Sequence, residues 1–476
     1  MIPIPLDPFR GVPGPWPWLL STAPTPADFD SMGPLALVVL LPFLGACVAP
    51  FTPTRFGTLF ARTAFLWTLP GALFLVAAAW FGAGGEAGAV RWLERLPGGA
   101  GLVLTPWNLV PALAVGLVAP LALAVSESRT WEPARSGWLL FLVASSQASL
   151  LAGGPELATF GWLGGAWALF FLLGHQDAAG QGERAVGPFV LHAAAAACVF
   201  VAGFVPGFGA LLALAGVIRL GVAPFHATLL RTFETLPTGA MLLVGVAFLA
   251  TGLRAVHDGL FALAPGPARD SLAAAAAVAA VWSGLVALPQ DDLRRRIGGY
   301  LSTLGAVWCG LLAVLPPAEG RAAVGGWALV VIVALVALVV AYARLWAFTR
   351  TGDLRAYGGL VRTALLRATL LGFTLVAVVA APLLSAQGRP LAALAKITLA
   401  RPAVGLGLVI GGALGALGLM LAVYRTLRGA PPTPIEAPEL RGLEWVFVAS
   451  LALTLGFLAA LEPPLGGLGG LWPVTP

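Results

Sequence analysis

The sequence predicts an all-α polytopic membrane protein with about 14 transmembrane helices. Three observations support this fold class: the composition, the length of the apolar runs and the position of the charges. Hydrophobic residues make up 59% of the chain and charged residues 10%, with a mean hydropathy of +0.92. Soluble domains carry about 25% charged residues. The charges lie mainly between apolar runs, as expected for loops that join membrane helices.

The apolar runs have the length that a bilayer requires, because a helix needs roughly 20 residues to cross its hydrocarbon core. We expect spans at residues 33–50, 63–83, 106–126, 137–153, 156–174, 186–204, 207–230, 238–257, 270–288, 298–316, 323–349, 363–385, 402–425 and 443–461. Residues 389–399 are expected to form a half-helix that continues a broken twelfth span.

Spans four to eight and nine to thirteen form two blocks of equal helix number, and each block holds one interrupted helix with a nearby arginine. Because the number of helices in a block is odd, the blocks point in opposite directions, as in transporters with inverted five-helix repeats. The predicted regions are an irregular N-terminal segment (1–32), helices one to four (33–153), the first repeat core (156–257), the second repeat (270–425), and a C-terminal loop with helix fourteen (426–476).

Arginine predicts the orientation, because positive residues concentrate in cytoplasmic loops. With the N-terminus outside, the cytoplasmic loops contain 15 arginines and the opposite loops contain six Lys or Arg residues. We therefore expect both termini on the non-cytoplasmic side, which is the periplasmic side of a bacterial inner membrane. The net charge of +6 is not concentrated in a dense basic patch, so nucleic acid is not an expected partner.

Motifs for covalent chemistry are missing from the sequence. It has no phosphate loop, no dinucleotide fingerprint, no catalytic triad and no His/Cys cluster. The three cysteines, Cys47, Cys198 and Cys309, lie in separate apolar runs. We therefore expect neither a cofactor, nor a metal, nor a catalytic site in this chain.

The stretch from Ile218 to His226 is the first candidate site, because it places a charge and a helix-breaking proline within an apolar run. Arg219 either stands on an ion or proton path or joins helices by bonding carbonyls or a carboxylate. His226 follows Pro224 and is either a proton relay or a hydrogen-bonding group at the break. His192, in an alanine-rich span, is interpreted as a packed core residue.

Two further polar segments lie at the ends of predicted spans. Arg294, Arg295 and Arg296 are either a cytoplasmic topology anchor or a contact with a partner protein. Glu234 is placed where water can reach it.

Four fragments, in this order and spacing, resemble the antiporter-like membrane subunits (M, N and L type) of NADH–quinone oxidoreductase (complex I), which are related to cation/proton antiporter subunits. The fragments are Ile218-Arg219 with Pro224-Phe225-His226, Glu234 to Thr238, Gln290 to Ile297 followed by Tyr300 and Ser302, and Ala381-Pro382 with Gly388-Arg389. The resemblance implies a fourteen-helix subunit that lies beside other membrane subunits within the lipid bilayer. It also implies a proton path made of a glutamate on the fifth span and lysines on later spans.

This sequence departs from that pattern where protons would be exchanged. The fifth span has no carboxylate between residues 157 and 173, and the eighth has no lysine between 242 and 252, although Arg254 falls near the family's arginine. Arg219 and Arg389 stand where the family has lysines. Because arginine keeps its proton, with a pKa above about 12, we expect proton translocation to be reduced or lost.

The resulting hypothesis is a membrane-arm subunit of a complex I-like assembly. The alternative is a component of a cation/proton antiporter or of an ion-driven uptake complex. The ion-pathway candidates are Arg219, His226, Arg389, Arg254 and Glu234, and the helix-break candidates are Pro224, Pro382 and Gly388.

Overall fold

The computed structural model describes a helical bundle. It covers residues 33–53, 65–82, 90–92, 101–104, 106–125, 133–174, 181–205, 207–263, 265–349, 353–354, 359–363, 365–385 and 389–428. The predicted N-terminal segment and the fourteenth span therefore lie outside the described residues.

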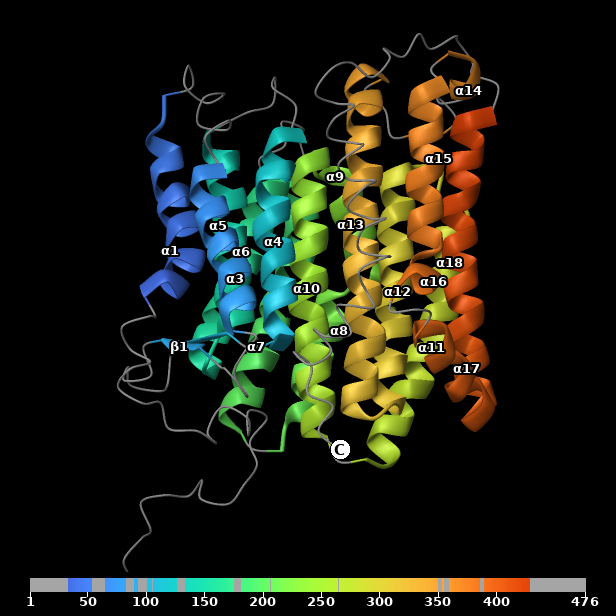
Figure 1. The fold of residues 1–476 in the computed structure, drawn as a ribbon, viewed down its shortest axis with the longest axis horizontal. Helices are drawn as coiled ribbons and strands as arrows, with labels where there is room; N and C mark the ends of the chain where they lie inside the picture. The colour runs from blue at the N-terminus through green and yellow to red at the C-terminus, as the bar shows by residue number, and fades with distance from the viewer. Residues whose placement is uncertain are drawn as a thin grey trace, which may run out of the picture.

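The helices run roughly side by side (Figure 1). In the first part of the chain they are α1 (Gly33–Val48), the short 3₁₀ helix η3 (Ala49–Phe51), α3 (Phe65–Gly82), α4 (Pro106–Val125), α5 (Pro133–Leu151), α6 (Pro155–Gly174), α7 (Gln181–Phe204), α8 (Gly209–Arg219), α9 (His226–Thr235) and α10 (Thr238–Ala262). In the second part they are α11 (Pro267–Ala287), α12 (Leu293–Val314), α13 (Pro317–Thr349), α14 (Leu360–Thr363), α15 (Leu365–Val379), α16 (Ala381–Leu384), α17 (Arg389–Ala400) and α18 (Pro402–Arg428).

A helix lies at every span predicted before residue 428. Among the described residues, seven helices are long and apolar enough to cross a membrane. The chain is thus a multi-pass membrane protein, and the number of fourteen crossings stays a prediction. Both expected interruptions are present: α8 and α9 are separated by residues 220–225, and the twelfth span is divided into α15, α16 and α17.

A short β-hairpin is an exception to the all-helical prediction. Strands β1 (Val90–Trp92) and β2 (Leu102–Leu104) pair antiparallel in the segment between α3 and α4. The two strands contain β-branched, aromatic and other apolar residues, which favour extended structure. Leu102 also bridges to Ala152 beyond the end of α5, so the hairpin lies at that end of the bundle.

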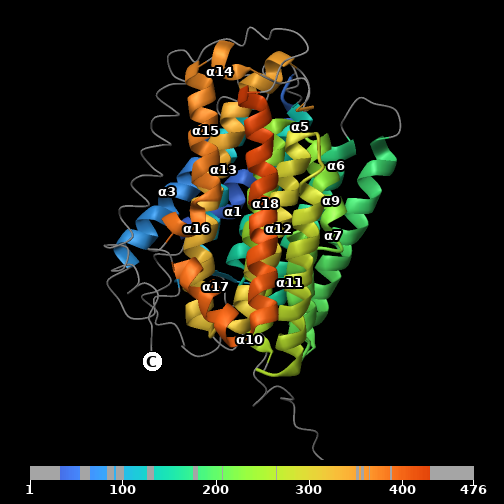
Figure 2. The same ribbon diagram turned by 90° about the vertical axis from the view of Figure 1, so that its right-hand side faces the viewer.

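Helix α10 is the centre of the bundle. It lies between the helices of the first part and those of the second (Figure 1), contacting α4, α5, α8, α12 and α13. Every residue from Thr238 to Leu260 is buried. Outer helices bury only one face. In Figure 2, α18 and α11 form part of the outer surface, with Val278, Trp282 and Leu406 exposed.

Glycines let α8 approach α10 closely. Gly252 and Gly259 are seven residues apart, which places them on one face of α10, and a Cβ added to either would meet the backbone of α8 within 3.2 Å. A Cβ added to Gly216 of α8 would lie 2.6 Å from the carbonyl oxygen of Gly252. Small residues at such crossings allow backbone-to-backbone packing between membrane helices.

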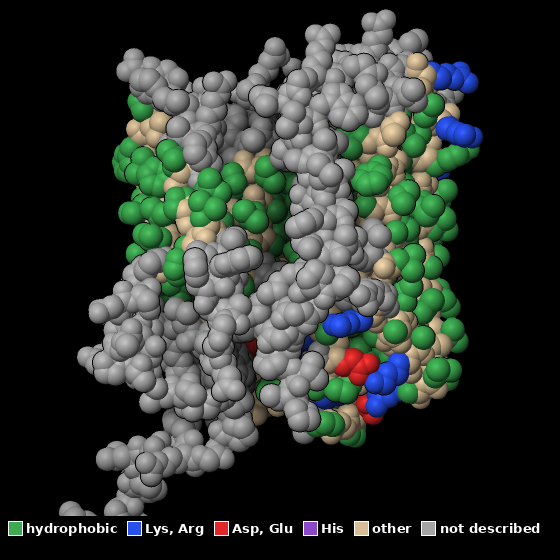
Figure 3. Space-filling view, in the orientation of Figure 1, with side chains coloured by type: hydrophobic (Ala, Val, Ile, Leu, Met, Phe, Trp, Pro, Cys, Tyr) green, Lys and Arg blue, Asp and Glu red, His purple; other side chains and the backbone are tan. Residues whose placement is uncertain are grey.

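The described surface has the pattern expected in a bilayer. In Figure 3, hydrophobic side chains cover the middle of the visible described surface, Lys and Arg lie toward its upper and lower ends, and Asp and Glu lie in the lower part. Ion pairs near helix ends join Lys396 of α17 to Glu319 of α13 at 2.7 Å, and Arg401, after α17, to Asp270 of α11. An apolar belt between charged ends places the helix ends at the two membrane surfaces.

The α8–α10 crossing predicts that Gly216→Val will destabilise the protein by about 1–3 kcal/mol, because its side chain would displace packed backbone. Gly187→Val on α7 is the matched control, since an added Cβ there meets nothing within 4 Å. Thermal unfolding in detergent measures both. Equal midpoints for the two variants would contradict this packing.

Candidate functional site

The interruption between α8 and α9 is stabilised by a glycine and a serine. Gly221 has a φ of +61°, a conformation that side chains disfavour, and a Cβ there would lie 2.7 Å from Leu229 Cβ. Ser302 Oγ of α12 donates to the carbonyl of Gly221 at 2.6 Å. It is also 3.0 Å from Ser283 Oγ of α11. The break thus keeps its backbone bonded while it is buried in the bundle.

Helix α12 also bonds the other interrupted helix. Tyr300 Oη donates to the carbonyl of Val378, near the end of α15, at 3.1 Å. Tyr300 and Ser302 are two residues apart on α12, yet they reach the two different interruptions. Both residues belong to one of the four fragments quoted above, and both bind backbone carbonyls near helix breaks.

Arg219 is the last residue of α8 and is only 2% exposed. Its guanidinium lies between two aromatic rings, 4.1 Å from the ring centroid of Trp162 and 4.6 Å from that of Phe248. Its Nη2 donates to the carbonyl of Trp162 at 3.2 Å. Aromatic faces attract a cation electrostatically, most strongly when water is absent. Of the two interpretations of Arg219, this geometry supplies the contacts of the second, in which the arginine joins helices through a carbonyl.

Among the described residues, no carboxylate forms an ion pair with Arg219. Its Nε and Nη1 have no hydrogen-bond partner there. A Cβ at Gly165 of α6 would lie 3.1 Å from Nη1, so α6 meets the guanidinium with backbone and an aromatic ring. His192 of α7 is buried and packs on the Phe248 ring, with a centroid separation of 4.7 Å.

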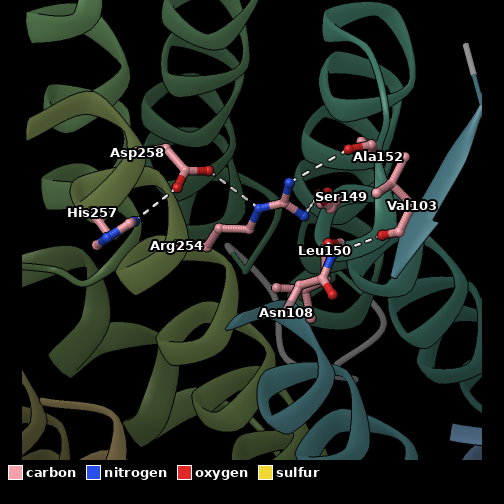
Figure 4. Close-up of polar contacts among 8 residues, drawn as sticks. All are labelled: Val103, Asn108, Ser149, Leu150, Ala152, Arg254, His257 and Asp258. Atoms are coloured by element: carbon pink, nitrogen blue, oxygen red, sulfur yellow. Dashed lines mark hydrogen bonds and ion pairs between the residues drawn. The ribbon is translucent and has the colours of Figure 1, made fainter. Parts of the chain in front are cut away.

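A second buried charged cluster lies on α10, and Figure 4 shows how its side chains converge. Arg254 Nε donates to Asp258 Oδ2 at 3.3 Å. His257 Nδ1 lies 2.9 Å from Asp258 Oδ1. Arg254 is 5% exposed and Asp258 is 2% exposed, so this ion pair is fully enclosed by protein.

The same arginine also caps the C-terminal end of α5. Nη1 donates to the carbonyl of Ser149 at 3.3 Å, and Nη2 donates to that of Ala152 at 3.4 Å. Asn108 Nδ2 of α4 bonds the Leu150 carbonyl at 2.9 Å and the Val103 carbonyl at 2.8 Å. The last carbonyls of a helix have no partner within it and carry partial negative charge. Arg254 and Asn108 supply the missing donors (Figure 4).

A small cavity separates the two arginine sites. Its volume is about 10 Å³, and its lining includes Trp162, Thr251, Arg254 and Asp258. A polar cavity of about this size accommodates roughly one water molecule. Because Trp162 also contacts Arg219, one aromatic side chain stands between the Arg219 guanidinium and the cavity.

The remaining predicted site residues are distributed over other parts of the bundle. His226 begins α9 and is partly buried, and the cis-linked Pro224 before it is exposed. Glu234 is at the far end of α9, with its Oε2 3.7 Å from Arg295 Nε. Arg389 begins α17 and is exposed.

The structure therefore does not gather all the predicted residues into one site. Arg219 lies on α8, which packs on α10 and α7, whereas the helix of Arg389 packs on α13 and α18. Pro382 lies in α16 at the second break. Gly388 is outside the described residues.

The triple-arginine segment bonds carbonyls as well. Arg294 Nη1 donates to the carbonyl of Leu236, after the end of α9, at 2.8 Å, and its guanidinium lies 3.7 Å from the Trp346 ring centroid. Arg296 donates to the carbonyls of Gln290 and, at 2.6 Å, Gly418. Arg294 and Arg296 thus link helices. The cytoplasmic position of the segment stays a prediction from the arginine distribution.

Sequence reasoning missed Asp258 and His257. The predicted span ended at residue 257, whereas α10 continues to Ala262. A usable signal was present, because Arg254 and Asp258 are four residues apart and therefore adjacent on a helix. Opposite charges at this spacing neutralise each other, so the helix can continue past both residues.

The chain was compared with protein-family models, curated proteins and solved structures. No protein-family model and no curated protein matches the sequence. Among solved structures, a chain of the membrane-bound sulfane sulfur reductase, an archaeal respiratory membrane complex, matches with a TM-score of 0.78, 13% identity, and coverage of 92% of this chain and 96% of that one. A chain of respiratory complex I from Thermus thermophilus matches with a TM-score of 0.76, 20% identity, and coverage of 92% and 97%.

The chain has the fold of the antiporter-like membrane subunits. A chain of the Mrp complex from Dietzia sp. DQ12-45-1b matches as well, with a TM-score of 0.73, 15% identity, and coverage of 93% of this chain and 97% of that one. The antiporter-like fold thus extends over nearly the whole length of both partners in each comparison. At these identities the likeness establishes the fold, and the sequence resemblance had indicated the same architecture.

Removing the Ser302 hydroxyl tests the bonding of the first break. Ser302→Ala leaves a buried carbonyl of Gly221 without its side-chain donor, which costs about 1–3 kcal/mol. Ser149→Ala is the control, because that hydroxyl bonds the Ser145 carbonyl of its own helix, and its loss costs less than about 0.5 kcal/mol. Thermal unfolding of the two purified variants measures the difference. A Ser302→Ala variant as stable as the control would contradict the assigned role.

Proposed function

We propose that this chain is a membrane-arm subunit of a complex I-like assembly. The observation that carries the proposal is the match of 92–93% of this chain to at least 96% of chains taken from three membrane complexes. The exposed apolar faces of α11 and α18 are available for other membrane subunits or for lipid.

We further propose that Arg219 acts as a fixed charge, so that proton translocation through this site is reduced or lost. Its guanidinium is enclosed by Trp162 and Phe248 and bonded to a backbone carbonyl. A proton carrier must release its proton near physiological pH, which a buried lysine can do and an arginine cannot. Without a carboxylate partner among the described residues, this part of the bundle has a helix-joining role.

The alternative is a component of a cation/proton antiporter or an ion-driven uptake complex. The buried Arg254–Asp258 pair and the adjacent cavity favour it, since buried ionisable groups in membrane proteins often mark ion pathways. In either case, we propose a bacterial inner membrane location with both termini on the periplasmic side, which rests on the arginine distribution.

Membership in an assembly predicts the result of an affinity purification. A tagged chain extracted from its native membrane in mild detergent should co-purify with several other multi-pass subunits and with NADH–quinone oxidoreductase-type subunits. Mass spectrometry and native gel electrophoresis measure this. Recovery of the chain as a lone monomer, under conditions that keep a known complex of the same membrane intact, would count against the proposal.

Ion flux distinguishes the fixed-charge role of Arg219 from a transport role. In vesicles containing the purified assembly, Arg219→Ala should leave cation-dependent proton flux unchanged relative to the wild-type protein. Arg231→Ala, at an exposed position of α9, is the matched control. A loss of flux in Arg219→Ala alone, at equal protein content, would favour the alternative function.

A further inference from the structure

We propose that the junction of α5 and α10 is a binding site for a small monovalent cation. In the wild-type chain the guanidinium of Arg254 occupies this site in place of a dissolved ion. The site consists of the oxygen atoms that surround the guanidinium. Asp258 Oδ2 accepts from Nε at 3.3 Å, and the carbonyls of Ser149 and Ala152 accept from Nη1 and Nη2 at 3.3 and 3.4 Å. Carboxylate and carbonyl oxygens are the ligands preferred by hard metal cations.

The electrostatic field of the site favours a cation independently of the arginine. Both carbonyls lie at the C-terminal end of α5, where aligned peptide dipoles place partial negative charge. Asp258 adds a full negative charge that is 2% exposed. Removing the guanidinium would leave this carboxylate buried without its ion-pair partner, which is strongly unfavourable.

The charge balance selects a monovalent ion. Among the described residues, Asp258 is the carboxylate that bonds Arg254, and its other oxygen lies 2.9 Å from His257 Nδ1. Arg321 of α13 also attracts Asp258 electrostatically. A divalent ion would therefore leave uncompensated positive charge inside the bundle, where charge is costly to bury. The guanidinium of Arg254 carries one positive charge, and a monovalent ion in its place would leave the charge of the site unchanged.

The fit of the guanidinium leaves room for another occupant. Charge-assisted hydrogen bonds are typically about 2.7–2.9 Å long, and the bonds that Arg254 donates to Asp258, Ser149 and Ala152 are each longer. The cavity of about 10 Å³ that contacts Ser149, Thr251 and Asp258 adds space for roughly one water ligand. A shorter side chain at position 254 would vacate the space of the guanidinium and connect it with this cavity. A hydrated cation could then reach the oxygens of Asp258, Ser149 and Ala152.

The wild-type chain therefore carries an internal cation at this junction, and its stability there does not depend on dissolved ions. This inference concerns the folding of the chain and does not rest on its membership in an assembly. Failure of the following experiment would leave the proposed function unaffected.

The test compares thermal unfolding of the full-length purified chain in sodium chloride, potassium chloride and choline chloride at equal ionic strength. Arg254→Gln should be less stable than wild type in choline chloride. Its unfolding midpoint should rise by at least about 2 °C, saturably, with sodium or potassium. The wild-type protein and Arg254→Lys, which keep a tethered cation, should show no such rise. The double variant Arg254→Gln/Asp258→Asn should also show none, because it lacks the carboxylate.

Three outcomes would overturn the proposal. The first is an unfolding midpoint of Arg254→Gln that is equal in all three salts. The others are a saturable rise of the midpoint with sodium or potassium in the double variant, and a rise of equal size in the wild-type protein. If Arg254→Gln does not survive purification in choline chloride, the yield of monodisperse protein after extraction in each salt replaces the midpoint. Recovery with sodium or potassium supports the site. No recovery in any salt, while Arg254→Lys folds, overturns it.

Discussion

Backbone carbonyls at helix ends and helix breaks inside an apolar bundle need donors, and most of this structure depends on how the chain supplies them. Water cannot reach these groups, and an unbonded buried carbonyl is costly. The donors come from a few long or well-placed side chains. Arg254 bonds the end of α5, Arg294 bonds the end of α9, and Ser302 bonds the break after α8. The polar groups of the interior therefore form junctions between helices.

Arginine is suited to this role because its planar fork presents five donors in a fixed geometry. Arg254 bonds one carboxylate and two carbonyls at once, a combination that a lysine ammonium would match poorly. The chain has 27 Lys and Arg residues, and Lys396 is the only lysine. Arg219 follows the same pattern, because it bonds a carbonyl and lies against two aromatic rings.

The sequence predicted the helices well, because length and apolarity decide them locally. It also predicted both interruptions, and a proline lies at each of them, Pro224 at the first and Pro382 at the second. It could not show that Trp162 and Phe248 enclose Arg219, because these residues are far apart in the sequence and meet only in the packed bundle. Asp258 was missed because a charge near the end of an apolar run resembles a loop residue until its partner is known. Arg389 lies apart from Arg219 because their helices pack on different neighbours.

The position of Tyr300 and Ser302 on a single helix has a mechanical consequence. The two side chains are separated by about 3 Å along the axis of α12, and each is tied to a different interrupted helix. A slide or rotation of α12 would therefore change the geometry of both bonds at once, which couples the two breaks. Packed helices move past one another in small shear steps. Helix α12 therefore links the interrupted helix of the first half of the chain to that of the second half.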